Sequence, residues 1–236
     1  MKHMKSFLVF SCIITAALVL SGAGMAAVSA GLTVAGFDSG EMKRGAPSGW
    51  ELVKKDGTPN LTLEKKEAKY VLHMKSDSRS SFGIQKDLDL GTEKYPFLSW
   101  EWKVTRLPRG ADVRAAATDD QAIQIYVAFE PTARPAKFNT PVIGYIWGGE
   151  CPKDTFVTSS QPFAGKVRYV VLRNKEDVLD TWYSEKRNME EDYRKMFHDI
   201  DDGQPRDIKG ISFYINSQKT KSEAESYIYN VRFSRE

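Results

Sequence analysis

The sequence predicts an all-β fold, an antiparallel sandwich with one short α-helix. Short segments alternate between apolar and polar residues with a period of two, which is the side-chain spacing of a β-strand. Turns rich in glycine, proline and aspartate separate these segments at the intervals typical of antiparallel sheets. Only one helical pattern interrupts them, and a parallel sheet needs many helical crossovers. These three observations together favour the sandwich.

The first 30 residues have the features of a signal peptide. Lys2 and Lys5 precede an apolar run over residues 7–20, and the small residues 28–30 suit cleavage near Ala30. The run is short for a membrane-spanning helix, so an uncleaved anchor is the weaker interpretation. We expect a periplasmic or secreted protein without a stable membrane span after cleavage. Residues 31–236 are long enough for one domain with a sizeable core.

Charge and cysteine content narrow the possible partners. Of 34 basic residues, two lie in the first 30, which leaves 32 against 31 acidic residues and a net charge of about +1. No basic cluster is interleaved with aromatic residues, so nucleic acid is not an expected partner. Cys12 is removed with the signal peptide, and Cys151 alone cannot form an internal disulfide. The core must therefore hold the domain together.

About ten or eleven strands are expected after residue 30. Trp100 and Trp102 alternate with Glu101, which predicts that both tryptophans lie in the core and that Glu101 faces away from it. Tyr145 and Trp147 are assigned to the core by the same pattern. After an opening segment at 31–38, the expected strands are 50–54, 60–64, 69–75, 82–90, 97–104, 121–129, 142–147, 166–173, 209–216 and 226–233.

One helix is predicted near residues 188–198. Asn188 is a suitable N-cap, and Glu191 follows three residues later, as in a capping box. Arg187 and Asp192 are expected to fasten this helix to the sandwich. Its apolar face is formed by Met189, Tyr193 and Phe197.

A series of short motifs runs from about residue 37 to residue 233. It comprises residues 98–102 (LSWEW), Asp119-Asp120, 125–129 (IYVAF), 145–147 (YIW), 170–173 (VVLR), Trp182, 185–188 (EKRN), 192–194 (DYR) and 231–233 (VRF). Together they resemble an exported bacterial family known as domain of unknown function 3047. The resemblance implies a jelly-roll sandwich like those of galactose-binding and carbohydrate-binding modules, and it implies no established activity.

The polar faces of the predicted strands supply the candidate ligand site. A sheet face with amides, tyrosines and one carboxylate can form hydrogen bonds with sugar hydroxyls or a short polar ligand. The alternative is an ordinary solvated face of an antiparallel sandwich. Gln124, Asn216 and Asn230 stand where the family pattern has charged residues, which lowers the charge of this face. The expected site residues are Glu101, Gln124, Tyr126, Arg168, Tyr214, Asn216 and Asn230.

Motifs for catalysis or metal binding are weak. Asp119 and Asp120 are interpreted as a turn or surface pair, because calcium needs six or more oxygen ligands and no calcium loop surrounds them. His73, His198 and Cys151 belong to no nucleophile motif. We expect no cofactor, no metal and no assigned catalytic residue.

The expected function is non-catalytic binding of a saccharide or a cell-envelope component. One alternative is a hydrolase or lyase that acts on polysaccharide, with Glu101 or a loop aspartate as acid or base, although glycoside hydrolysis needs a pair of carboxylates. A second alternative is a structural or assembly partner in the cell envelope. This role would use the loop of residues 130–141, which three prolines predict to be extended and outside the sheet.

Overall fold

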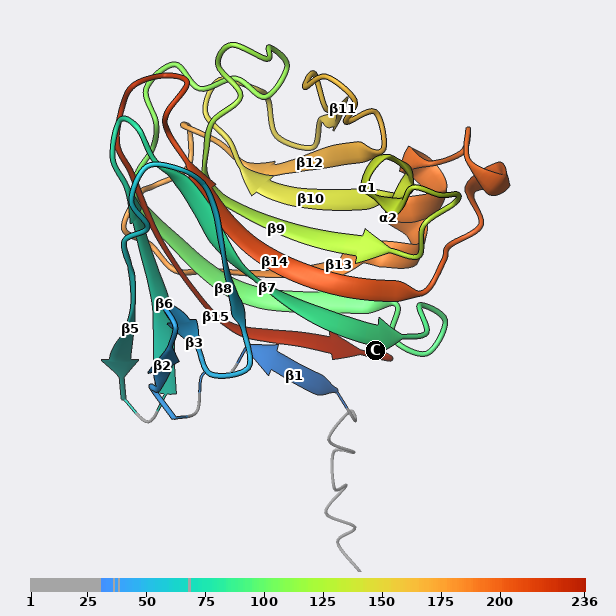
Figure 1. Cartoon of the computed structure of the whole chain (residues 1–236), viewed down its shortest axis with the longest axis horizontal. Helices are drawn as coiled ribbons and strands as arrows, with labels where there is room; N and C mark the ends of the chain where they lie inside the picture. The colour runs from blue at the N-terminus through green and yellow to red at the C-terminus, as the bar shows by residue number, and fades with distance from the viewer. Residues whose placement is uncertain (1–30, 36, 38, 68) are drawn as a thin grey trace, which may run out of the picture.

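Two β-sheets packed face to face hold most of the regular structure (Figure 1). The computed structural model describes residues 31–236 except 36, 38 and 68, so the predicted signal peptide lies outside the described residues. Within them, sheet I has the strand order β13–β8–β15–β6–β5, with β1 paired to β15. Its strands are β1 (Leu32–Ala35), β5 (Leu61–Lys66), β6 (Lys69–Ser76), β8 (Phe97–Arg106), β13 (Tyr183–Asn188) and β15 (Ala224–Ser234).

Sheet II has the order β11–β12–β10–β9–β14–β7–β4. Among the described strands, the pair β10 and β12 is parallel and the other pairs are antiparallel. A separate hairpin joins β2 (Met42–Lys43) to β3 (Ala46–Pro47). The strands of sheet II are β4 (Glu51–Asp56), β7 (Ser81–Leu90), β9 (Gln121–Phe129), β10 (Val142–Trp147), β11 (Phe156–Thr158), β12 (Val167–Arg173) and β14 (Ile208–Asn216). The predicted all-β, jelly-roll-like sandwich is confirmed.

The core lies between the inner faces of the two sheets, where the alternation pattern placed it. Trp100 and Trp102 of β8 are almost completely buried, as are Tyr145 and Trp147 of β10. The ring of Trp100 lies 5.3 Å from that of Tyr145, and the ring of Trp102 lies 5.7 Å from that of Trp147. Because β8 belongs to sheet I and β10 to sheet II, these aromatic pairs join the sheets. The prediction that these four residues form core is confirmed.

Helix α2 (Met189–Met196) follows the predicted cap. The side-chain oxygen of Asn188 accepts hydrogen bonds from the backbone N–H groups of residues 190 and 191, at 3.1 and 3.2 Å. Asp192 forms an ion pair with Arg187 at 2.5 Å and accepts a hydrogen bond at 2.9 Å from the hydroxyl of Tyr145. The helix is therefore fastened both to β13 and to the core strand β10.

Several short elements, the β2–β3 hairpin among them, differ from the sequence-based expectation. Strand β13 has a charged sequence, YSEKRN, because one side of this edge strand is open to solvent. Strand β11 and the 3₁₀ turn η1 (Asp201–Gly203) are each three residues long, too short for a periodic signal. The proline-bearing loop is not fully extended, since it contains the single-turn helix α1 (Ala136–Asn139). Among the described residues, no helix has the length and apolar character that crossing a membrane requires.

Candidate functional site

The seven predicted site residues lie in three separate places, so the expectation of one shared face is wrong. Glu101 and Asn230 are on the outer face of sheet I, and Arg168 points toward α2. Alternation assigns a side chain to one face of its own strand, but it does not determine which sheet the strand joins. The other four lie on the outer face of sheet II: Gln124, Tyr126, Tyr214 and Asn216.

Arg168 binds the C-terminal end of α2. Its guanidinium donates to the backbone carbonyl of Met196 and to both carboxylate oxygens of Asp199, at 2.6 and 2.7 Å. A cation is favourable at this position, because the last carbonyl groups of a helix carry partial negative charge. The Arg168 guanidinium therefore stabilises the C-terminal end of α2 and does not belong to the expected ligand face.

Gln124 and Asn216 are buried on the outer face of sheet II, beneath loops that include Asp119 and Asp120. Oδ1 of Asn216 accepts hydrogen bonds from Nε2 of Gln124 at 2.6 Å and from the backbone N–H of Gln121 at 3.0 Å. Its Nδ2 donates to the backbone carbonyl of Asp119 at 2.9 Å and to Oδ1 of Asp120 at 3.0 Å. This part of the face is filled by protein, and both amides serve the packing of the loops.

Asp119 and Asp120 are buried, which corrects their assignment to a turn or surface pair. Asp119 accepts hydrogen bonds from Gln121 at 2.8 Å and from Gln161 at 2.7 Å. Asp120 accepts from the backbone N–H and the hydroxyl of Thr220, at 2.6 and 2.8 Å. Burial raises the pKa of Asp119 above its usual value despite these donors. The described residues contain no group of three or more histidine, cysteine or acidic side chains arranged to hold a metal ion.

Tyr126 and Tyr214 remain partly accessible on sheet II. Their rings are 6.4 Å apart, and the ring of Tyr169 lies 6.1 Å from that of Tyr126. Gly144 lies beneath two of these rings, since a Cβ there would be 2.7 Å from Tyr169 and 3.0 Å from Tyr126. A shallow hollow of about 190 Å³ adjoins Tyr126 between β7, β9 and β14. It is smaller than the 300–1,000 Å³ typical of ligand pockets.

Glu101, in the middle of β8, is held by two donors from the neighbouring strand β15. The hydroxyl of Tyr229 donates to Oε2 at 2.5 Å, and Nδ2 of Asn230 donates to Oε1 at 3.0 Å. Two consecutive residues reach one carboxylate because the β15–β8 register shifts here and Asn230 has a φ of 55°. Asparagine tolerates this left-handed conformation, and such bulges re-aim side chains. The carboxylate therefore has a fixed orientation on the outer face of sheet I.

Three aromatic side chains lie around this carboxylate, and we call Trp182, Tyr227 and Tyr229 the aromatic patch. The ring of Trp182 lies 5.0 Å from that of Tyr229 and 6.4 Å from that of Tyr227, edge-to-face in both cases. All three side chains are partly accessible to solvent. Burial raises the pKa of Tyr229 to about 12, and its bond to Glu101 acts in the same direction. The Tyr229 hydroxyl therefore remains a hydrogen-bond donor at neutral pH.

Lysine side chains lie over the rings of the aromatic patch. Nζ of Lys66 is 4.0 Å from the ring centroid of Trp182 and 5.0 Å from that of Tyr229. Nζ of Lys103 is 4.6 Å from the centroid of Tyr227. Lys66 comes from β5 and Trp182 directly precedes β13, and these strands stand at the two ends of the sheet I order. Sheet I is therefore curled enough for the long side chain of Lys66 to reach Trp182 across its outer face.

His73 completes the face on the side of β6. Its ring is stacked on that of Tyr227 at 4.3 Å, with 4° between the ring planes. Nδ1 lies 2.6 Å from Oε1 of Glu64, and Nε2 lies 2.8 Å from Oε1 of Glu225. The histidine joins three neighbouring strands and leaves neither ring nitrogen for other chemistry.

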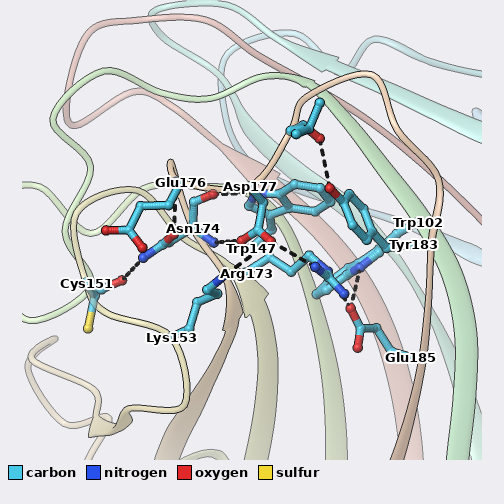
Figure 2. A network of polar contacts seen from close by, with 11 residues as sticks. Trp102, Trp147, Cys151, Lys153, Arg173, Asn174, Glu176, Asp177, Tyr183 and Glu185 are labelled. Atoms are coloured by element: carbon cyan, nitrogen blue, oxygen red, sulfur yellow. Dashed lines mark hydrogen bonds and ion pairs between the residues drawn. The ribbon is translucent and has the colours of Figure 1, made fainter.

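A second polar network lies where β12 of sheet II approaches β13 of sheet I (Figure 2). Nε of Arg173 donates to Oε1 of Glu185 at 2.7 Å, and Nη1 donates to Asp177 at 2.8 Å. The indole N–H of Trp102 donates to the same Glu185 oxygen at 3.2 Å. The guanidinium also lies 3.7 Å from the ring centroid of Tyr183. This network ties the two sheets together next to the aromatic patch.

Sequence reasoning identified Glu101 and Asn230 but missed most of their neighbours. Tyr227 and Tyr229 alternate with Ile228 in a predicted strand, and this pattern alone would have placed both tyrosines on its polar face. Trp182 gives no such signal, because it precedes a short charged edge strand. Lys66 lies close to the aromatic patch because sheet I is curled, and this curvature cannot be predicted from the local sequence.

Residues 48–232 match the family described as "Protein of unknown function (DUF3047)". The chain belongs to this family. The match covers most of both sheets, including β8, β13 and the central part of β15, and so includes the aromatic patch. No curated protein matches the chain.

Solved structures with similar shape include carbohydrate-binding modules and one enzyme domain. The family 11 module of a cellulosomal cellulase from Clostridium thermocellum has 9% identity and a TM-score of 0.44, covering 87% of this chain and 95% of the module. A module specific for non-crystalline cellulose has 15% identity and a TM-score of 0.40, covering 85% and 92%.

The enzyme domain is the xyloglucanase domain of NopAA, a type three effector from Sinorhizobium fredii, solved in complex with cellobiose. It has 8% identity and a TM-score of 0.45, covering 79% of this chain and 93% of that domain. Similarities at this level are too low to transfer a ligand or an activity from any of these proteins to this chain.

Proposed function

We propose that the protein is an exported domain, spanning residues 31–236, that binds a saccharide or a saccharide-bearing cell-envelope component without catalysis. The aromatic patch on the outer face of sheet I is its binding site. One observation carries the proposal: three partly accessible aromatic side chains lie on one sheet face around the oriented carboxylate of Glu101. The features of the first 30 residues support export.

This combination of groups suits the chemistry of a sugar ring. A pyranose has apolar C–H faces, which pack well against flat aromatic side chains, and a rim of hydroxyl groups. Glu101 retains lone pairs that accept hydrogen bonds from hydroxyl groups, and the lysine ammonium groups at the edge of the patch are donors. Because Tyr229 and Asn230 already orient Glu101, binding requires little further ordering of this carboxylate.

An oligosaccharide array that contains both neutral and acidic glycans tests this proposal, followed by calorimetry on each glycan retained. Trp182→Ala should weaken binding about tenfold, since loss of a stacking ring and its buried area is worth roughly 1.4 kcal/mol. Phe163→Ala is the matched control, because Phe163 is an aromatic residue 86% exposed elsewhere on the surface. Thermal unfolding of both variants should resemble that of the unaltered protein.

Two results would overturn the proposal. The first is an array without any retained glycan, or one whose retained glycans bind Trp182→Ala as tightly as the original. The second is release of shorter products from a bound glycan that stops in Glu101→Gln, since this would make the protein a hydrolase or lyase.

The assembly alternative is favoured by a different surface. Phe138 of α1 and Phe163 are 48% and 86% exposed, and their rings lie 6.2 Å apart. Exposed aromatic pairs often mark protein interfaces. If this surface defines the function, a Phe138→Ser and Phe163→Ser double variant should lose an envelope protein that co-purifies with the original chain.

A further inference from the structure

Two lysines face each other across the β5–β6 hairpin at the edge of the aromatic patch. Lys66 of β5 and Lys69 of β6 are register partners, so both side chains lie on the same face of sheet I. Nζ of Lys66 lies over Trp182 and Tyr229, and Nζ of Lys69 is 5.9 Å from the ring centroid of Tyr229. Like charges directly opposite each other are destabilising in an antiparallel pair. The contacts between the ammonium groups and the aromatic rings are favourable, but the repulsion between the two lysines opposes them.

Four acidic side chains of this face are already engaged, whereas Glu67, in the turn between the two lysines, is exposed and its charge helps to raise the pKa of Tyr229. Glu101 accepts hydrogen bonds from Tyr229 and Asn230, and Asp180 forms an ion pair with Lys103 at 2.6 Å. Glu64 and Glu225 both bind His73. Within the part of the chain that the structure describes, neither Lys66 nor Lys69 forms an ion pair with a carboxylate. Both ammonium groups therefore lack a directly bonded carboxylate within the described residues.

We infer that the site prefers anionic saccharides, in which a carboxylate on the sugar ring, as in a uronic acid, binds between Lys66 and Lys69. This inference rests on the proposed function and names its substrate class. The ring of the uronate stacks on the aromatic patch, and its carboxylate relieves the repulsion between the two ammonium groups. Anionic ligand groups and lysine form charge-assisted hydrogen bonds, which are stronger than neutral ones.

The test compares oligogalacturonate with the same oligosaccharide after methyl esterification. The ester keeps the sugar rings and removes the negative charge, so it isolates the role of the carboxylate. We expect the free acid to bind about tenfold more tightly than the ester, with an advantage that shrinks as the salt concentration rises. Calorimetry at low and high salt measures both effects.

Lysine variants locate the effect. Lys66→Met and Lys69→Met keep most of the side-chain length and remove the charge, and together they should abolish the preference for the acid while binding of the ester persists. Lys65→Met is the matched control, because Lys65 is exposed on the same strand and points to the opposite face. It should leave the preference unchanged.

The outcomes separate this inference from the proposed function. If acid and ester bind equally and Trp182→Ala weakens both, saccharide binding stands and the preference for anions is wrong. The preference is also wrong if the double lysine variant retains it. If the array retains no glycan at all, the proposed function itself fails.

Discussion

Replacing Asn216 with alanine removes four hydrogen bonds from the buried polar cluster under the loops of sheet II. Its amide oxygen accepts at 2.6 and 3.0 Å, and its amide nitrogen donates at 2.9 and 3.0 Å. At about 1 kcal/mol for each bond, and with several buried partners left unsatisfied, Asn216→Ala should lower the free energy of unfolding by about 4 kcal/mol. That is a large share of the stability of an ordinary domain.

Urea unfolding, followed by tryptophan fluorescence, measures this loss. Asn60→Ala is the control: Asn60 is exposed, its side chain forms no hydrogen bond among the described residues, and its replacement should change stability by less than about 0.5 kcal/mol. If Asn216→Ala costs less than about 1 kcal/mol, the cluster does not hold the loops and the reasoning fails.

Asn216→Asp adds an electrostatic test at the same position. The new carboxyl replaces an amide donor 3.0 Å from Oδ1 of Asp120 in a buried place, so its pKa in the folded protein must rise above the unfolded value. Such a group favours the folded state when protonated. The destabilisation should therefore be larger at pH 7 than at pH 5. Equal losses at both pH values would show that the two carboxylates do not meet.

Three further predictions concern other parts of the fold. Gly144→Ala places a Cβ 2.7 Å from Tyr169 and should cost about 1–3 kcal/mol in urea unfolding, with a changed tyrosine signal in near-ultraviolet circular dichroism; unchanged spectrum and stability would contradict the ring placement. Burial opposes ionisation of Glu225, but its bonds to His73 outweigh this and lower its pKa below the usual 4.5. Its carboxylate therefore stabilises the fold above that pH and loses this effect as the pH falls, so Glu225→Gln should cost about 1 kcal/mol at pH 7 and less near pH 3; a loss independent of pH would refute the assignment. Arg168→Met should lower the melting temperature by several degrees while leaving any saccharide affinity intact, because Arg168 holds α2; a selective loss of affinity would return Arg168 to the site.

Most of the fold was predicted from the alternation of apolar and polar residues along each strand. Trp100 and Trp102 are core and Glu101 is outside because side-chain direction within one strand is local information. The grouping of Glu101 with Gln124 failed for the opposite reason: strand order and sheet membership depend on contacts far apart in the sequence. Asp119 and Gln124 looked solvent-facing, and their burial results from loops that fold back over sheet II. The sandwich was therefore predictable from the sequence, whereas the contact between Lys66 of β5 and the ring of Trp182 was not.

The Arg173–Glu185 bridge of Figure 2 has a consequence for local opening of the structure. An edge strand such as β13 pairs on one side only, so it would ordinarily be among the first segments to detach and exchange its amide protons. Detaching β13 here also means separating Arg173 from Glu185 and exposing the indole N–H of Trp102. Slow hydrogen exchange in β13 would follow. Trp182, immediately before this strand, would then keep its place without a ligand, and the entropy lost on binding would be correspondingly small.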